Sequence, residues 1–267
     1  MNARSLLVRG LLAGLLAGLA TFLVAYVAGE PYVEAAIALE DSNAGASVRS
    51  DSHSEEPEGH SQADSSAEDE VSGVSRGVQR TGGLLTGSLA VGVALGGLVA
   101  LVAAGALGRL GTLLPSQSTA LVALIGFVSA ALVPFLKYPS TPPGVGSGDT
   151  IGERTALYFG FLLVSVAAAA LATYAACLLR ERIGTYGGVV AGTAAYLLVV
   201  LVAGQVFPTV NEIGNFPADT LWFFRRSSLF TLATLWGVLG VALTGLVSRL
   251  YAQQMAIAER RALAASM

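Results

Sequence analysis

Long uncharged apolar runs alternate with short polar segments along the whole chain. A helix that crosses a hydrocarbon core of ~30 Å needs about 20 apolar residues, and six runs reach that length. Lipid offers no water to unpaired backbone groups, so these runs are expected to be helices; barrel strands would be about ten residues long and alternating. The predicted helices span approximately 6–29, 82–108, 118–136, 155–179, 187–208 and 227–249.

This pattern predicts an all-α integral membrane protein, with six transmembrane helices in one bundle and a single membrane domain over residues 1–267. Arg4 and Arg9 precede the first apolar run, as in a secretory signal peptide. That run is longer than the usual apolar block of 7–15 residues, so we expect a retained helix, with a cleaved signal as the alternative.

Composition supports the same class of protein. Of the 267 residues, 54% are hydrophobic and 12% are charged, and the mean hydropathy is +0.66. A soluble domain carries about 25% charged residues, so a cytosolic enzyme and a disordered chain are both excluded. The one cysteine, Cys177, permits no intrachain disulfide.

Acidic residues are concentrated in one segment. Glu30 to Arg80 holds 12 acidic and 3 basic residues, a net charge of −9, although the whole chain has only −3. Within it, residues 42–75 are rich in Ser, Glu and Asp and too poor in apolar residues to fold, so we predict a flexible, disordered acidic outer loop between the first two helices. No basic face with interleaved aromatic residues exists, which excludes nucleic acid as a partner.

The arginine and lysine positions favour N- and C-termini in the cytoplasm. In that orientation the inner segments are much shorter than the outer ones and have the higher density of basic residues. The inner set is Arg4, Arg9, Arg109, Arg180, Arg182, Arg249, Arg260 and Arg261. The outer set is Arg49, Arg76, Arg80, Lys137, Arg154, Arg225 and Arg226.

Glycines recur four residues apart on several predicted helices, a spacing that lets two backbones approach closely in lipid. The contacts are expected within this one chain, with a contact between subunits of a homo-oligomer as the alternative. The positions are Gly10, Gly14 and Gly18, then Gly83 and Gly87, Gly92 and Gly96, and Gly188 and Gly192.

Residues suited to catalysis are absent from the six apolar cores. The cores contain no Asp, Glu, Lys, Arg or His, and no nucleotide-binding G-x-x-x-x-G-K-[ST] run occurs. Ionisable groups inside a membrane usually mark ion paths and proton relays, so a proton-driven pump working alone is disfavoured. We expect that the protein is not an enzyme and that it binds no cofactor.

The predicted outer segments hold the candidate metal ligands. Glu30 and Glu34 lie one helical turn apart and can share a cation with help from a third group, although a solvated helix end with both charges facing water is the favoured interpretation. His53 and His60 lie among carboxylates, a ligand set for divalent cobalt, nickel or zinc, or else belong to a hydrophilic tether. Glu212 and Asp219 complete the set of candidates.

Several runs of this sequence resemble the CbtA-type cobalt transporter subunit family, over essentially the whole chain. The more specific ones are Val133–Pro139 with Pro142 and Pro143, and Asp149–Tyr158. Val210–Glu212, Phe216–Arg225, Arg9–Gly18, Gly29–Ala35 and Val78–Gly87 fit as well.

The resemblance implies a bacterial inner-membrane protein that takes up cobalt for cobalamin synthesis, with a small histidine-bearing CbtB-type membrane subunit as partner. The family's loop after the first helix is often richer in histidine than this one, so the carboxylates near the membrane are rival ligands. We therefore predict a subunit of a cobalt uptake system, in which the outer loop captures the ion and the helices conduct it inward. The alternative is a membrane scaffold that assembles a partner complex and transports nothing.

Overall fold

The computed structural model describes residues 2–51 and 75–266, with the backbone alone for residues 43–51. All regular structure in these residues is helical, which confirms the predicted all-α class. In chain order the segments are α1 (Ala3–Val24), the π-helix η1 (Ala25–Gly29), α2 (Glu30–Asp51), α3 (Arg76–Val78), the π-helix η3 (Gln79–Gly83), α4 (Leu84–Ala106), α5 (Pro115–Gly126), the π-helix η4 (Phe127–Leu132), α6 (Val133–Lys137), the 3-10 helix η5 (Gly148–Thr150), α7 (Ile151–Val206) and α8 (Ala218–Ala265).

Many of these segments join end to end. Five continuous helices among the described residues are long and apolar enough to cross a membrane. They are Ala3–Ser42, Arg76–Ala106, Pro115–Lys137, Gly148–Val206 and Ala218–Ala265.

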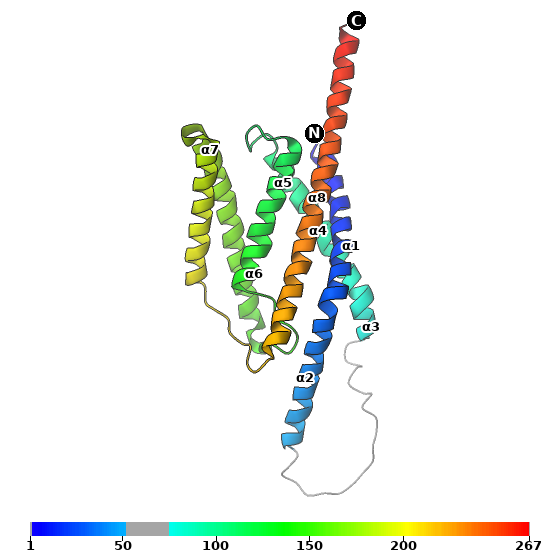
Figure 1. Cartoon of the computed structure of the whole chain (residues 1–267), viewed down its shortest axis with the longest axis vertical. Helices are drawn as coiled ribbons and strands as arrows, with labels where there is room; N and C mark the ends of the chain where they lie inside the picture. The colour runs from blue at the N-terminus through cyan, green and yellow to red at the C-terminus, as the bar shows by residue number, and fades with distance from the viewer. Residues whose placement is uncertain (1, 52–74, 267) are drawn as a thin grey trace.

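The predicted count of six differs from these five at α7. Gly184 has φ 78° and ψ 166°, and the chain reverses there with helical residues on both sides (Figure 1). The predicted helices 155–179 and 187–208 are therefore the two arms of one hairpin. Only glycine adopts such a positive φ at little cost, so Gly184 sets the position of the turn.

The first and last helices extend well beyond their predicted ends. The first continues from Ala3 to Asp51 rather than ending at 29, and α8 spans Ala218–Ala265 rather than 227–249. The helix ends were predicted from apolar content alone. A helix can continue into water beyond its apolar part, because its backbone hydrogen bonds are made within the helix. Residues 42–51 of the predicted flexible loop are thus helical; flexibility of residues 52–74 remains a prediction, because they lie outside the described residues.

Two prolines lie inside continuous helices, each just after a π-helical segment. Pro31 follows η1 and Pro134 follows η4. A proline ring clashes with the carbonyl four residues earlier, and a local widening of the helix relieves that clash. The first long helix therefore continues through Pro31.

The core is built around α1, which packs on α4 and α8, while α5 packs on the other side of α8 (Figure 1). A Cβ at Gly14 would overlap the Gly92 carbonyl oxygen, and one at Gly92 would lie 2.8 Å from the Cα of Gly18. Gly188 and Gly192 pack in the same way on the opposite arm of α7. These glycines make contacts within the chain, as expected.

Both termini lie at one end of the bundle, together with the turn of α7 (Figure 1). The far ends of α2 and α3 and the connections 138–147 and 207–217 lie at the opposite end, which we call the loop end. The described parts of the segments predicted to be outer thus share one side, and those predicted to be inner share the other. That the termini face the cytoplasm remains a prediction.

Candidate functional site

A cavity of about 1010 Å³ occupies the loop end of the bundle. We call it the loop-end cavity. Its wall combines the junction of η1 and α2, the end of α6, the start of α7, the 210–213 connection and the start of α8. Its polar lining is Glu30, Lys137, Tyr138, Ser140, Thr141, Arg154, Thr155, Tyr158, Asn211, Glu212, Arg225, Ser227, Ser228 and Thr231.

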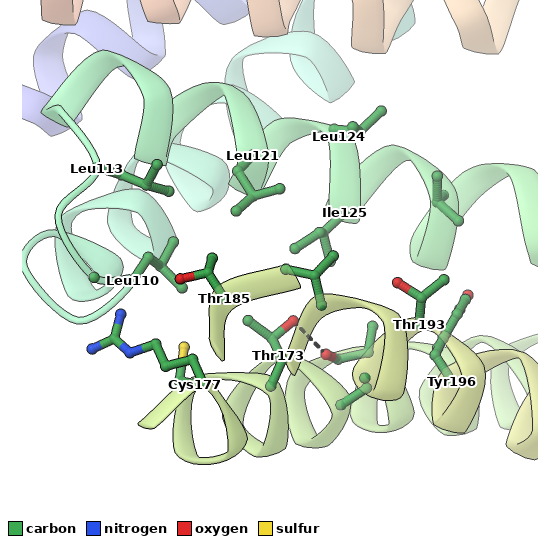
Figure 2. A pocket seen from close by; sticks show the side chains of 18 of the residues that line it. Leu110, Leu113, Leu121, Leu124, Ile125, Thr173, Cys177, Thr185, Thr193 and Tyr196 are labelled. Atoms are coloured by element: carbon green, nitrogen blue, oxygen red, sulfur yellow. Dashed lines mark hydrogen bonds between the residues drawn. The ribbon is translucent and has the colours of Figure 1, made fainter. Parts of the chain in front are cut away.

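A second cavity of about 990 Å³ lies nearer the termini, between Pro115–Ser129 and the two arms of α7. Its lining is mostly apolar: Leu121 and Ile125 face Thr173 and Thr193 across it (Figure 2). Among the described residues that line it, Arg180 is the only charged one. We call it the termini-end cavity, and its lining offers no carboxylate for a metal.

The two cavities lie along the same helices, and a buried aromatic contact lies between their linings along α7. On the first arm of α7, residues 151–159 line the loop-end cavity and residues 169–180 line the other. Phe161 lies between them with 2% exposure. Its ring centroid is 5.9 Å from that of Tyr138 and 5.5 Å from that of Phe207, both in edge-on contacts.

Glu30 is a buried carboxylate at the wall of the loop-end cavity. Its Oε2 accepts a hydrogen bond of 2.8 Å from a terminal guanidinium nitrogen of Arg76, and the two side chains are 8% and 39% exposed. One turn further along, Glu34 pairs with Arg80 at 2.5 Å, but Glu34 is exposed and does not line the cavity. The two pairs tie α2 to the start of the next continuous helix.

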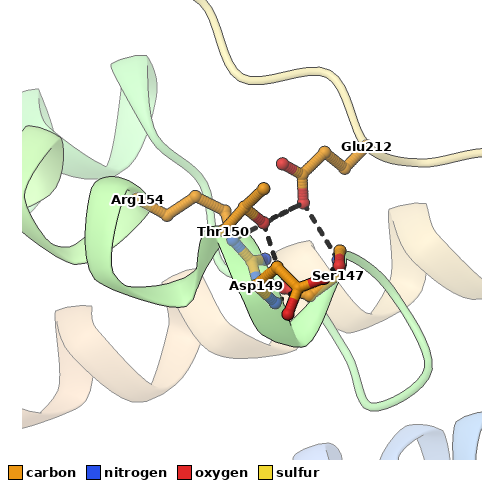
Figure 3. A network of polar contacts seen from close by, with 5 residues as sticks. All are labelled: Ser147, Asp149, Thr150, Arg154 and Glu212. Atoms are coloured by element: carbon orange, nitrogen blue, oxygen red, sulfur yellow. Dashed lines mark hydrogen bonds and ion pairs between the residues drawn. The ribbon is translucent and has the colours of Figure 1, made fainter.

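Glu212, in the lining of the same cavity, is held by a polar network (Figure 3). Its Oε2 accepts from the Thr150 hydroxyl at 2.9 Å and the Ser147 amide at 3.2 Å, and lies 3.5 Å from Arg154 Nε. Arg154 also donates to the Ser147 carbonyl at 3.0 Å. A Cβ at Gly146, where φ is 97°, would overlap the guanidinium, so glycine leaves the space that Arg154 fills.

Two residues at the end of α6 close a third side of the loop-end cavity. Lys137 Nζ donates to the Gly204 carbonyl at 2.7 Å, and the Tyr138 hydroxyl donates to the Pro208 carbonyl at 2.7 Å. Burial raises the pKa of the Tyr138 phenol, so it stays protonated and remains a donor. These bonds fix the second arm of α7 against α6.

The structure brings together only part of the predicted ligand set. Glu30 and Glu212 line one cavity, each with an arginine partner. Asp219 is exposed in the first turn of α8 and lies outside the lining. His53 and His60 lie outside the described residues, and within the described part no three His, Cys, Asp or Glu side chains form a group that could hold a metal.

Sequence reasoning missed the cationic half of the loop-end cavity. Lys137, Arg154 and Arg225 all line it, whereas Arg226 stacks on the Phe223 ring at 4.7 Å and stays exposed. All of them flank apolar runs, where basic residues are common, so the sequence alone does not distinguish a cavity residue from a residue near lipid headgroups.

Comparison with known proteins gives one match. The family model described as "Probable cobalt transporter subunit (CbtA)" matches residues 3–248, which is nearly the whole chain. No curated protein and no solved structure matches.

Proposed function

The chain belongs to the CbtA family of probable cobalt transporter subunits, and on that premise we propose that it is the conducting membrane subunit of a cobalt uptake system, with the loop-end cavity as its outer vestibule. In this proposal the loop end faces outward, the termini lie in the cytoplasm, and cobalt is the cargo. The observation that carries it is the convergence of Glu30 and Glu212 on one cavity of about 1010 Å³.

The arginine partners make this a site of transient occupancy. A carboxylate paired with arginine is already neutralised, so a divalent cation must displace Arg76 or Arg154 before it can use Glu30 or Glu212. Arg76 is 39% exposed, so water can solvate its guanidinium once it is released. Such competition weakens binding, which suits a site that passes its ion onward. Residues 52–74, with His53 and His60, would raise the local metal concentration beside it.

The route inward continues towards the termini-end cavity. Hydroxyls of Ser129, Thr173 and Thr193 lie along that cavity and can replace part of the water shell of an ion. In this proposal the Phe161 contact separates the two cavities, so passage requires that contact to open. The π-helix η4 packs on the same helix, α7. Such π-helical segments are frequent at functional sites.

A second candidate is a scaffold that transports nothing, and one observation favours it. Only 17% of the most apolar stretch of α7 is buried, compared with 28% to 33% in the other four continuous helices. An unburied hairpin is where a partner helix of the CbtB type would pack. The glycine seams do not serve this role, because Gly14, Gly92 and Gly192 are occupied within the chain.

Uptake of radioactive cobalt, in cells depleted of their own importers, tests the proposal. The chain is expressed with and without a candidate CbtB-type subunit, and membrane insertion is verified by fractionation. We expect uptake above background that requires the chain and that unlabelled cobalt competes away. Background uptake in both settings, with the protein present in the membrane, contradicts transport and favours the scaffold.

A further inference from the structure

Three donors in the lining of the loop-end cavity have no hydrogen-bond partner in the described part of the chain. They are Ser140 Oγ, Arg154 Nε and Arg225 Nε, and all three atoms are buried. Arg154 Nε lies 3.5 Å from Glu212, so its charge is already paired. Buried polar groups are almost always satisfied by protein, water or a ligand, so Ser140 and Arg225 need an explanation.

The side chains that line the same cavity carry more positive than negative charge. Glu30 is neutralised by Arg76, and Glu212 by Arg154. Among the described residues, neither Lys137 nor Arg225 has an ion-pair partner. Lys137 directs one hydrogen to the Gly204 carbonyl, which leaves two for a ligand.

Lys137, Ser140 and Arg225 come from two parts of the fold that are far apart in the sequence. Lys137 ends the helix Pro115–Lys137, Ser140 lies in the following connection, and Arg225 lies near the start of α8. Their convergence is not a property of basic residues at this end in general, because the adjacent Arg226 is exposed, stacked on Phe223 and absent from the lining.

We propose that the loop-end cavity binds an oxyanion, a carboxylate or phosphate group, with Arg225, Lys137 and Ser140 as its donors. A guanidinium, an ammonium and a hydroxyl are the groups that form short, charge-assisted hydrogen bonds to such oxygens. The carboxylate of a metal chelate and the phosphate of a phospholipid headgroup present the same chemistry. The volume of about 1010 Å³ accommodates either, being far larger than a single ion.

This inference goes beyond the proposed transport function, because anion binding does not require that metal cross the membrane. If the oxyanion is part of a chelate, it also specifies the cargo, which is cobalt coordinated by anionic oxygen ligands. The negative charge of these ligands offsets the excess positive charge of the cavity lining, which would repel a bare divalent ion.

The test uses the full chain in dodecyl maltoside, a detergent without a phosphate or carboxylate group, and measures binding by calorimetry. One arm titrates citrate, cobalt–citrate and inorganic phosphate; a second arm adds phosphatidylglycerol and detects retained lipid by native mass spectrometry. The variants are Arg225→Gln, Lys137→Gln and Ser140→Ala, and the matched control is Arg226→Gln. Thermal unfolding verifies that each variant is folded.

We expect an oxyanion to bind the wild-type chain, and Arg225→Gln to weaken that binding on the order of tenfold or more, because it removes a charge-assisted donor. Arg226→Gln should leave it within about twofold. Binding of citrate or its cobalt complex indicates a chelate as the source, and binding of phosphatidylglycerol alone indicates a headgroup.

Equal losses in Arg225→Gln and Arg226→Gln would overturn the proposal, since general surface charge would then explain the attraction. No binding in either arm would overturn it too. If Arg225→Gln fails to fold, Lys137→Gln and Ser140→Ala decide in its place: unchanged binding in both contradicts the site. None of these results depends on transport.

Discussion

Glu30 and Arg76 are 46 residues apart in the sequence, yet their side chains meet at 2.8 Å at the wall of the loop-end cavity. The pair connects the first long helix to the second, close to the π-helical segment in each of them. In our account this arginine holds a buried carboxylate in place until the cargo takes it over.

If Arg76 competes with the metal, removing it should change how the protein responds to cobalt. Arg76→Gln leaves Glu30 buried without its cation, which lowers stability in the absence of metal. Added cobalt should then raise the thermal midpoint of the variant by several degrees more than that of the wild type. Thermal unfolding in detergent with and without cobalt measures this.

Arg80→Gln is the control for that comparison, because Arg80 makes the equivalent pair with an exposed carboxylate. Its midpoint should respond to cobalt like the wild type. Identical responses of the two variants would contradict a metal-competing role for Arg76.

The close approach of α1 and α4 predicts a strong dependence on glycine at one face. A Cβ at Gly92 would lie 2.8 Å from the Gly18 backbone, whereas one at Gly87 would meet nothing within 4 Å. Gly92→Val should therefore destabilise the fold by about 1–3 kcal/mol or more, as overpacking does, and Gly87→Val should be nearly neutral. Detergent-solubilised yield and thermal midpoint report the difference, and equal effects would argue against the packed seam.

The turn of α7 depends on the positive φ of Gly184. Gly184→Ala should cost about 1–3 kcal/mol, because an L-residue is strained in that conformation. Gly237→Ala in α8 meets no neighbour within 4 Å and should be neutral or slightly stabilising. Chemical denaturation of the two variants in parallel provides the comparison; a harmless Gly184→Ala would place the reversal elsewhere.

If the Phe161 contact separates the two cavities, shortening that side chain should let ions pass between them. Phe161→Ala removes the ring that contacts both Tyr138 and Phe207, so it should open a leak between the cavities. It should also lower stability by about 3–5 kcal/mol, the usual cost of truncating a buried phenylalanine. Phe230→Ala, at a position 53% exposed on α8, should do neither. Cobalt flux into proteoliposomes, with no gradient other than that of the ion, measures the leak; an unchanged flux in a folded Phe161→Ala variant would remove Phe161 from the path.

The sequence predicted best the features that depend on residues close together in the chain. Apolar runs located the helices. The four-residue glycine spacing indicated contacts within the chain at Gly14, Gly92 and Gly192 and their neighbours in the spacing, but it was wrong for Gly83 and Gly87, which make no close contact. The ends were missed because apolar content reports the membrane portion of a helix and not its continuation, as in the extension of α8 to Ala265.

The site was less predictable because its parts come together over long distances in the sequence. Glu30 and Glu212 were candidates from their positions near helix ends, but their arginine partners at 76 and 154 depend on how the loops fold. Glu30 and Glu34 look equivalent in the sequence, one turn apart on the same helix. Only packing distinguishes them, because it buries the first and exposes the second.

That difference gives the most direct test of the vestibule. Glu30→Gln and Glu34→Gln remove the same charge from neighbouring turns, and each carboxylate has an arginine partner. We would measure the initial rate of radioactive cobalt uptake for both, at equal amounts of protein in the membrane. Our account predicts that Glu30→Gln lowers uptake by about tenfold or more, the scale of losing one interaction of a charged group, and that Glu34→Gln stays within about twofold of the wild type. Equal uptake in the two variants would contradict the assignment of the loop-end cavity as the place where cobalt enters.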